Sequence, residues 1–217
     1  MTNTKRISIS ERPIIFNGEM VRAILDDRKM MTRRIFWVTD PVGIRHTINS
    51  PKEEILQFDD GSFHYLSTAG LSGPYPCPYG KAGDILWVRE NWAARLDEDH
   101  LSPKQLYENG KRSVGYWADG PEICCRTGCN GAAGKVRPSI HMPRWASRIT
   151  LEITDVRVER VQDIADNDCE SEGLKPLQGG IKSEFRILWD SINGKKEGCS
   201  WADNPYVWVV EFKRITP

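Results

Sequence analysis

The chain has 217 residues with 30 basic and 30 acidic side chains, so its formal net charge is zero. This balance excludes a protein coated with positive charge, the kind that binds long nucleic acid without regard to sequence. The hydrophobic fraction of 39% is too high for a disordered chain, and no apolar run approaches the roughly 20 residues of a membrane-spanning helix.

The first elements expected are a strand, a helix and a second strand. Residues 12–17 are typical of a short strand, and Asn17 is placed to cap a helix over 18–28. The apolar side chains of this helix recur at helical spacing and form one stripe. Residues 29–38 change to strand character, so the start of this stretch is a helix-to-strand junction.

The middle of the chain is predicted to hold short strands between loops rich in Pro, Gly and Ser. Residues 54–58 and 62–66 form a hairpin around an Asp-Gly turn. A strand is expected over 85–90, and a short helix after Ser102.

The last third carries the clearest patterns. Residues 145–161 alternate as a long strand or hairpin does. An acidic helix is expected over 162–174 and a second helix over 181–192, followed by a central strand at 205–215. The second helix should bury one apolar face, formed by Phe185, Leu188, Trp189 and Ile192.

This order of elements predicts an α+β fold, a small mixed β-barrel with peripheral helices. We expect a single domain over 1–217, because the length falls near that of one domain. Two stretches, 39–82 and 95–135, are interpreted as insertions into it.

The cysteines do not require a metal. Cys124, Cys125 and Cys129 form the only cluster, and with Cys77 they could supply four thiolates to a zinc ion. Their spacing is irregular and lacks a second CxxC pair, so free thiols are favoured and no metal or cofactor is expected. The polar first residues lack the core of a signal peptide, which indicates a cytoplasmic, reduced protein without a membrane partner.

The zero net charge conceals segregated charge. Residues 1–37 carry eight basic and four acidic side chains, and residues 152–172 carry eight acids against two arginines. A basic face and an acidic helix should therefore coexist. A mixed, solvated surface is an equal alternative, since charge runs usually face water.

Lys29 and Thr32 are the first candidates for chemistry. At a helix end, a Lys and a Thr three positions later can bring ammonium and hydroxyl together. Burial and neighbouring arginines would lower the pKa of Lys29, because both disfavour its charged form. A neutral lysine can then accept the hydroxyl proton, and an acidic partner could come from Asp166, Asp168, Glu170 or Glu172. The alternative, favoured by this pattern alone, is a basic helix end that complements the helix dipole.

Four segments together resemble the ASCH domain of the PUA-like superfamily. In the family's order they are ILDDRKMMTRR at 24–34, similar to ILxGRKTxTxR, then GDILWV at 83–88, ITLEITDV at 149–156 and YVWVVEF at 206–212. The stretch PSIHMPRWASRI at 138–149 resembles the versions found in bacteriophages and prophages.

The resemblance implies a compact barrel and one of two functions, nucleic-acid binding or removal of the acyl group from N4-acylated cytidine. In the enzymes a Lys, a Thr and a Glu form the proposed catalytic triad, which falls here on Lys29, Thr32 and Glu172. Asp27 replaces the family's Gly and Met30 its first Thr, so the acyl group and the size of the substrate stay open.

We therefore expect an N4-acylcytidine amidohydrolase that acts on a small nucleoside. Arg28, Arg33 and Arg34 are the expected substrate-binding residues, with Trp87 or Trp145 stacked on the base. The alternative is a non-catalytic RNA-binding module, or a nuclease, that uses the basic face around the same arginines. The sequence does not determine the oligomeric state.

Overall fold

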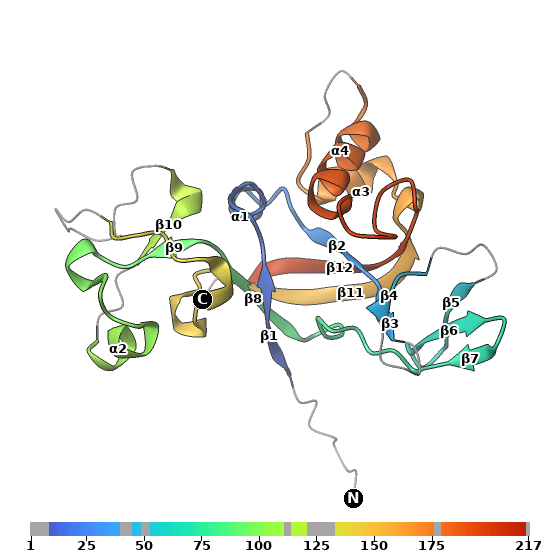
Figure 1. Cartoon of the computed structure of the whole chain (residues 1–217), viewed down its shortest axis with the longest axis horizontal. Coiled ribbons are helices and arrows are strands. Elements are labelled where there is room, and N and C mark those ends of the chain that lie inside the picture. Colours follow the sequence, from blue (N-terminus) through green and yellow to red (C-terminus); the bar gives the residue numbers. More distant parts are fainter. Residues whose placement is uncertain are drawn as a thin grey trace, which may run out of the picture. The chain divides into compact units, whose positions relative to one another are not determined.

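The structure is a computed structural model that describes residues 9–39, 45–48, 53–110, 114–120, 133–175 and 179–215. Strands predominate and helices are few (Figure 1), which confirms the expected α+β class. Across these described ranges, no helix combines the length and the apolar character needed to cross a membrane.

The largest sheet has five strands in the order β1-β8-β11-β12-β2. Their bounds are β1 Glu11–Ile15, β8 Ile85–Arg89, β11 Thr150–Arg160, β12 Tyr206–Ile215 and β2 Met31–Ile35. β1 is parallel to β8, whereas β8 pairs antiparallel with β11 and β12 antiparallel with β2. In the described part of the chain β1 and β2 are the edges of an open sheet, so the closed barrel stays a prediction.

The chain divides into two compact units. The first consists of Met1–Asp27, Gly83–Glu152 and Lys213–Pro217, and the second of Arg28–Ala82 and Ile153–Phe212. The long strands β11 and β12 contribute residues to both units. The single domain with two insertions stays a prediction, and each unit is described by itself below.

The helix of the first unit, α1 (Gly18–Leu25), is set by its two ends. The side-chain oxygen of Asn17 accepts a hydrogen bond from the Met20 N–H at 2.8 Å, which confirms the predicted cap. The helix ends before the predicted residue 28, because Asp27 adopts a left-handed φ of 55°. This conformation stops a helix just beyond its last turn.

The rest of the first unit surrounds a small apolar cluster. Its elements are β9 (Trp92–Ala93), η1 (Leu96–Glu98), α2 (Pro103–Glu108), β10 (Gly115–Tyr116), η2 (Trp117–Asp119), η3 (Ser139–His141) and η4 (Arg144–Ala146). α2 confirms the helix predicted after Ser102, which forms a capping box with Gln105. Leu106 and Met142 are among the side chains buried in the cluster.

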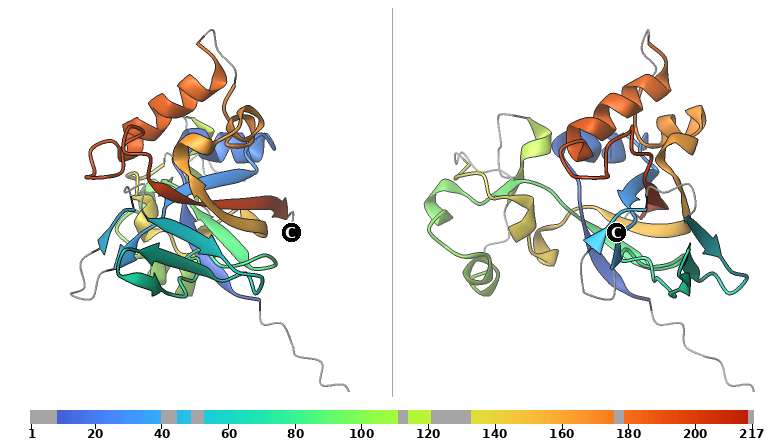
Figure 2. Two further views of the ribbon diagram at one scale, coloured as in Figure 1. Left: turned by 90° about the vertical axis from the view of Figure 1, so that its right-hand side faces the viewer. Right: turned by 45° about the vertical axis from the view of Figure 1, so that its right-hand side comes forward.

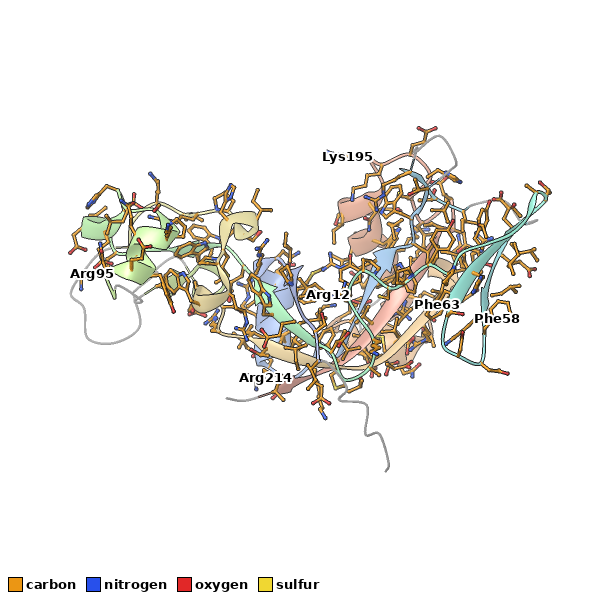
Figure 3. All side chains as sticks on the ribbon, turned by 90° about the horizontal axis from the view of Figure 1, so that it is seen from below. Arg12, Phe58, Phe63, Arg95, Lys195 and Arg214 are labelled. Atoms are coloured by element: carbon orange, nitrogen blue, oxygen red, sulfur yellow. The ribbon has the colours of Figure 1, made fainter. Side chains whose placement is uncertain are left out.

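The second unit contains the small strands. They are β3 (Val38–Thr39), β4 (Arg45–His46), β5 (Glu54–Gln57), β6 (Phe63–Ser67) and β7 (Gly70–Ser72). β5 and β6 confirm the predicted hairpin, and β7 adds a third strand that was not predicted. Figure 3 labels Phe63 in β6, whose ring centre lies 4.9 Å from that of Trp208. It also labels Phe58, which follows β5 and is exposed.

Two helices cover one face of β2 and β12 in the second unit. After η5 (Val161–Asp163), α3 (Asp166–Ser171) and α4 (Ile181–Asn193) lie side by side (Figures 1 and 2). α3 is shorter than the helix predicted over 162–174. Side chains of these helices and of β2 and β12 form one core, which includes Met31, Ile35, Val207, Val209, Cys169, Phe185 and Trp189.

The predicted apolar face of α4 was partly wrong. Phe185 and Trp189 are buried as expected, but Ile192 is 43% exposed. The buried positions follow a spacing of four residues from Ile181 to Asn193, so the core-facing stripe is narrower than the apolar pattern indicated.

Trp189→Phe is expected to destabilise the protein by on the order of 2 kcal/mol. The Trp189 Nε1–H donates to the Cys199 carbonyl at 2.9 Å, and Phe would leave this buried acceptor unpaired beside a small void. Urea denaturation measures the change. Ile187→Ala on the exposed side of α4 is the control and should stay within about 0.5 kcal/mol of the wild type; equal losses would contradict this orientation of α4.

Candidate functional site

The chain between α1 and β2 lies beside the residues that end α3. An isolated antiparallel bridge joins Lys29 to Glu172. The Met30 N–H donates to the Ser171 carbonyl at 2.7 Å, and the Met30 carbonyl accepts from the Phe212 N–H at 2.8 Å. The backbone thus holds two segments about 140 residues apart against each other, with β12 on the other side.

Lys29 and Glu172 form a buried ion pair. The Lys29 Nζ donates to Glu172 Oε2 at 2.5 Å and to the Glu172 carbonyl oxygen at 2.9 Å. The Lys29 side chain is fully buried, and that of Glu172 is 5% exposed. Burial lowers the pKa of Lys29; the Glu172 carboxylate opposes this, and the charges of Arg34 and Arg33 reinforce it. Lys29 therefore releases its proton more readily than an ordinary lysine.

Arg33 reaches the same carboxylate from β2. Its fully buried guanidinium lies 2.6 Å from Glu159 Oε1, 2.6 Å from Asp168 Oδ2 and 3.4 Å from Glu172 Oε1. Burial acts to lower the pKa of Arg33, but the surrounding carboxylates outweigh it and raise the pKa. Glu172 divides its two oxygens between two cations, Oε1 for Arg33 and Oε2 for Lys29.

Arg157 extends this arrangement toward solvent. It lies 3.3 Å from Glu159 and 2.9 Å from Asp168, and it also pairs with Glu211. The side chains of Arg157 and Glu211 are 30% and 34% exposed. We call the connected side chains the charge network; its members are Lys29, Arg33, Arg157, Glu159, Asp168, Glu172 and Glu211.

Thr32 is buried in β2, but it is not one helical turn from Lys29. α1 ends at Leu25 and β2 begins at Met31, so the chain near Thr32 is extended. Side chains alternate along a strand, which places Thr32 on the opposite face of β2 from Arg33. The Lys29 ammonium donates the two hydrogen bonds described above to Glu172. The pairing of Lys29 with Thr32 stays a prediction.

The expected substrate-binding arginines differ in their surroundings. Arg33 belongs to the charge network described above. The Arg28 guanidinium donates to the Gly173 carbonyl at 2.7 Å and so ties the start of the second unit to the end of α3. Arg34 lies in β2 near Tyr79, where burial raises the pKa of the phenol and the charge of Arg34 opposes the rise.

The two tryptophans proposed to stack on a base belong to the first unit. Trp87 is buried in β8, and the Arg89 guanidinium lies 4.7 Å from its ring centre. Trp145 in η4 is half-buried and packs against Trp92 and Tyr107. Both rings therefore have structural contacts of their own, and their role in binding stays a prediction.

Sequence reasoning missed the β11 side of the charge network. Leu151 and Ile153 are buried apolar residues of β11, and the next positions on the same face are Asp155, Arg157 and Glu159. A strand face that changes from apolar to alternating charge was the available signal. It indicates a core face that continues into a polar cluster.

The cysteine cluster at Cys124, Cys125 and Cys129 lies outside the described residues, and Cys77 is a free, partly buried thiol. Within the part of the chain that the structure describes, no three His, Cys, Asp or Glu side chains are grouped to hold a metal ion.

No protein-family model matches the chain, and neither a curated protein nor a solved structure matches it. The likeness to ASCH domains therefore remains a prediction from four short sequence segments.

The lowered pKa of Lys29 predicts a pH dependence of stability. Between the lowered pKa of Lys29 in the folded chain and the ordinary lysine value of 10.5, the folded chain has lost this proton while the unfolded chain keeps it. Because the unfolded state then binds more protons, raising the pH favours folding. The free energy of unfolding of the wild type, relative to Lys29→Met, should rise as the pH increases toward 10.5.

Urea denaturation at several pH values between about 8 and 10 measures this difference. Lys182→Met removes an exposed lysine of α4 and is the matched control. A pH dependence for Lys29→Met that is no steeper than that of this control would contradict the buried pair.

Proposed function

We propose that the chain is an amidohydrolase that removes the acyl group from N4-acylated cytidine or cytosine. The observation that carries this proposal is the contact of Lys29 Nζ with Glu172 Oε2 at 2.5 Å inside the protein. The motif resemblance assigned these residues to one catalytic site although they lie 143 positions apart. No feature of their local sequence requires them to meet.

The pair has the chemistry of a general base. A lysine with a lowered pKa is neutral in a larger fraction of molecules, and only the neutral amine can accept a proton. Glu172 orients Lys29 and stabilises the ammonium that forms when the proton arrives. Perturbed lysines of this kind are frequent at catalytic sites.

In the proposed reaction Lys29 removes the hydroxyl proton of Thr32, and the Thr32 oxygen bonds to the acyl carbon. The carbon–nitrogen bond then breaks, and the Lys29 ammonium returns its proton to the departing N4 amine. Water hydrolyses the acyl ester, which restores the hydroxyl and releases the carboxylic acid. The site residues need no metal or cofactor for these steps.

Thr32 decides between two routes. It lies on the face of β2 opposite Arg33, and a Lys–Glu pair can activate a water molecule by the same proton transfer. If Thr32→Val abolishes turnover, the nucleophile is the hydroxyl. If Thr32→Val retains turnover, the nucleophile is water and no acyl-enzyme forms.

The proposal includes the PUA-like ASCH fold, with the sheet closing into a small barrel. In support, Asp27 stands where the family motif has Gly, and it adopts the left-handed φ of 55° that glycine accepts most easily. An enzyme for a free nucleoside would work in the cytoplasm, in agreement with the composition.

The alternative, an RNA-binding module or nuclease, would use the basic segment from Arg28 to Arg34. The contacts of this segment count against it. Lys29 and Arg33 are buried among carboxylates, and Arg28 donates to a backbone carbonyl. Three of the four basic side chains of this segment are therefore engaged within the protein. A binding module would show an affinity for oligonucleotides that falls steeply with salt, and no turnover.

The test is release of cytidine from N4-acetylcytidine by the purified chain. Lys29→Met and Glu172→Gln should each lower kcat/KM by at least about 100-fold, the usual effect of removing a general base. Glu170→Gln removes an exposed carboxylate beside the site and should leave kcat/KM unchanged.

Circular dichroism and urea denaturation establish that each variant is folded at the assay temperature. The absence of cytidine release by the wild type would overturn the proposed function. Full activity of a folded Lys29→Met variant would overturn the mechanism.

A further inference from the structure

We propose that Arg33 is the positioning residue of this site: it holds one oxygen of Glu172 so that the other faces Lys29, and Asp168 and Glu159 balance its charge. The catalytic consequence rests on the proposed function, whereas the effect on the titration of Lys29 does not. Arg33 stands outside the Lys, Thr and Glu assigned by resemblance.

The geometry of Glu172 requires a second cation. Its carboxylate is almost fully buried, and Oε2 binds Lys29 at 2.5 Å. Arg33 Nη1 lies 3.4 Å from Oε1. Without Arg33 that oxygen would be a buried acceptor with one partner fewer, which is costly. The orientation of the carboxylate would then depend on Lys29 alone.

Arg33 is itself held on every side. Its Nε and Nη2 bind Glu159 Oε1 at 2.8 and 2.6 Å, and Nη2 binds Asp168 Oδ2 at 2.6 Å. Nη1 also lies 3.3 Å from Met31 Sδ, and the Phe185 ring centre is 5.9 Å from the guanidinium carbon. A guanidinium with this many partners has one position, so it can fix the position of Glu172.

The counterions lie between the buried pair and solvent. The exposed fraction of the side chain is 15% for Asp168 and 18% for Glu159, and it rises to 30% at Arg157. Asp168 and Glu159 each contact both Arg33 and Arg157. These carboxylates therefore offset part of the effect that the positive charge of Arg33 has on Lys29.

Charged groups reach the site from β2, β11, β12, α3 and the residue that follows α3. Lys29 is faced by Glu172 after α3 and by Arg33 and Arg34 of β2. Beyond Arg33 stand Asp168 of α3, Arg157 and Glu159 of β11, and Glu211 of β12. α4 contributes the uncharged Phe185 ring next to Arg33, and its Lys182 acts on the neighbouring Cys169.

These charges predict shifts of opposite sign. Removing the positive charge of Arg33 should raise the pKa of Lys29, because the ammonium loses a neighbouring like charge. Removing the negative charge of Asp168 should lower the pKa of Lys29, because Arg33 is then less compensated. A residue that only supports the fold has no reason to move the two in opposite directions.

The experiment follows the Lys29 side chain by NMR with carbon-13-labelled lysine, the Lys29 signal being identified by its absence in Lys29→Met. Arg33→Met should raise the titration midpoint and Asp168→Asn should lower it, each by on the order of one pH unit. Glu159→Gln should act like Asp168→Asn. Asp166→Asn removes the same charge from an exposed position of α3 and is the matched control, with no shift expected.

The pH profile of kcat/KM for N4-acetylcytidine is the second readout, and its acid limb should move in the same directions. Unchanged midpoints, or shifts of one sign, would overturn the positioning role. If Arg33→Met does not fold, Asp168→Asn and Glu159→Gln decide: a lowered Lys29 midpoint in both supports the positioning role, and an unchanged or raised midpoint overturns it.

The two proposals fail differently. Opposite shifts of Lys29 without cytidine release would overturn the proposed function and leave the positioning role intact. If the wild type releases cytidine and the acid limb of the kcat/KM profile is unchanged in Asp168→Asn, the positioning role alone is overturned.

Discussion

The burial of the Lys29 ammonium is the constraint on which the rest of the site depends. Transfer of a charged group from water to a protein interior costs several kcal/mol even after relaxation, so a carboxylate must accompany it. Glu172 does so at 2.5 Å. Because Glu172 is itself buried, it needs Arg33, and Arg33 in turn needs Glu159 and Asp168. Each buried charge is thus neutralised by the next one, up to the partly exposed side chains of Glu159, Asp168 and Arg157.

This requirement accounts for the position of α3. Asp168 lies in the middle of α3, and Glu172 follows the last residue of this helix. Both carboxylates reach Arg33 only if α3 lies against β2. The bridge between Lys29 and Glu172 holds the backbone in the same place. Replacement of a buried ion pair by apolar side chains of similar size is often neutral or stabilising. Stability alone therefore does not explain the charge network. A lysine with a lowered pKa is more often neutral and able to accept a proton, and such lysines are frequent at functional sites.

Local signals were sufficient to predict the elements that depend on nearby residues. The Asn17 cap, the helix after Ser102 and the β5–β6 hairpin are of this kind. The end of α1 was missed, because a left-handed Asp27 has no periodicity to reveal it. An acidic partner of Lys29 was expected from the predicted helix that contains Glu172, and motif resemblance selected Glu172 among its four candidate acids. The pairing of Arg33 with Glu159 could not be predicted, since it arises only when β2, β11 and α3 meet in three dimensions.

The extended conformation of the chain at Lys29 determines what the site can do. A helical spacing would have brought Lys29 and Thr32 together, but a strand places odd and even positions on opposite faces. Lys29, which precedes β2 in an isolated bridge, and Arg33 of β2 share Glu172, and Met31 lies against the Arg33 guanidinium. The buried pair of Lys29 and Glu172 thus lies on the side of β2 that Arg33 faces. In the proposed reaction the nucleophile must approach Lys29 from this side, so the position of the Thr32 hydroxyl, or of a water molecule in its place, determines which route is followed.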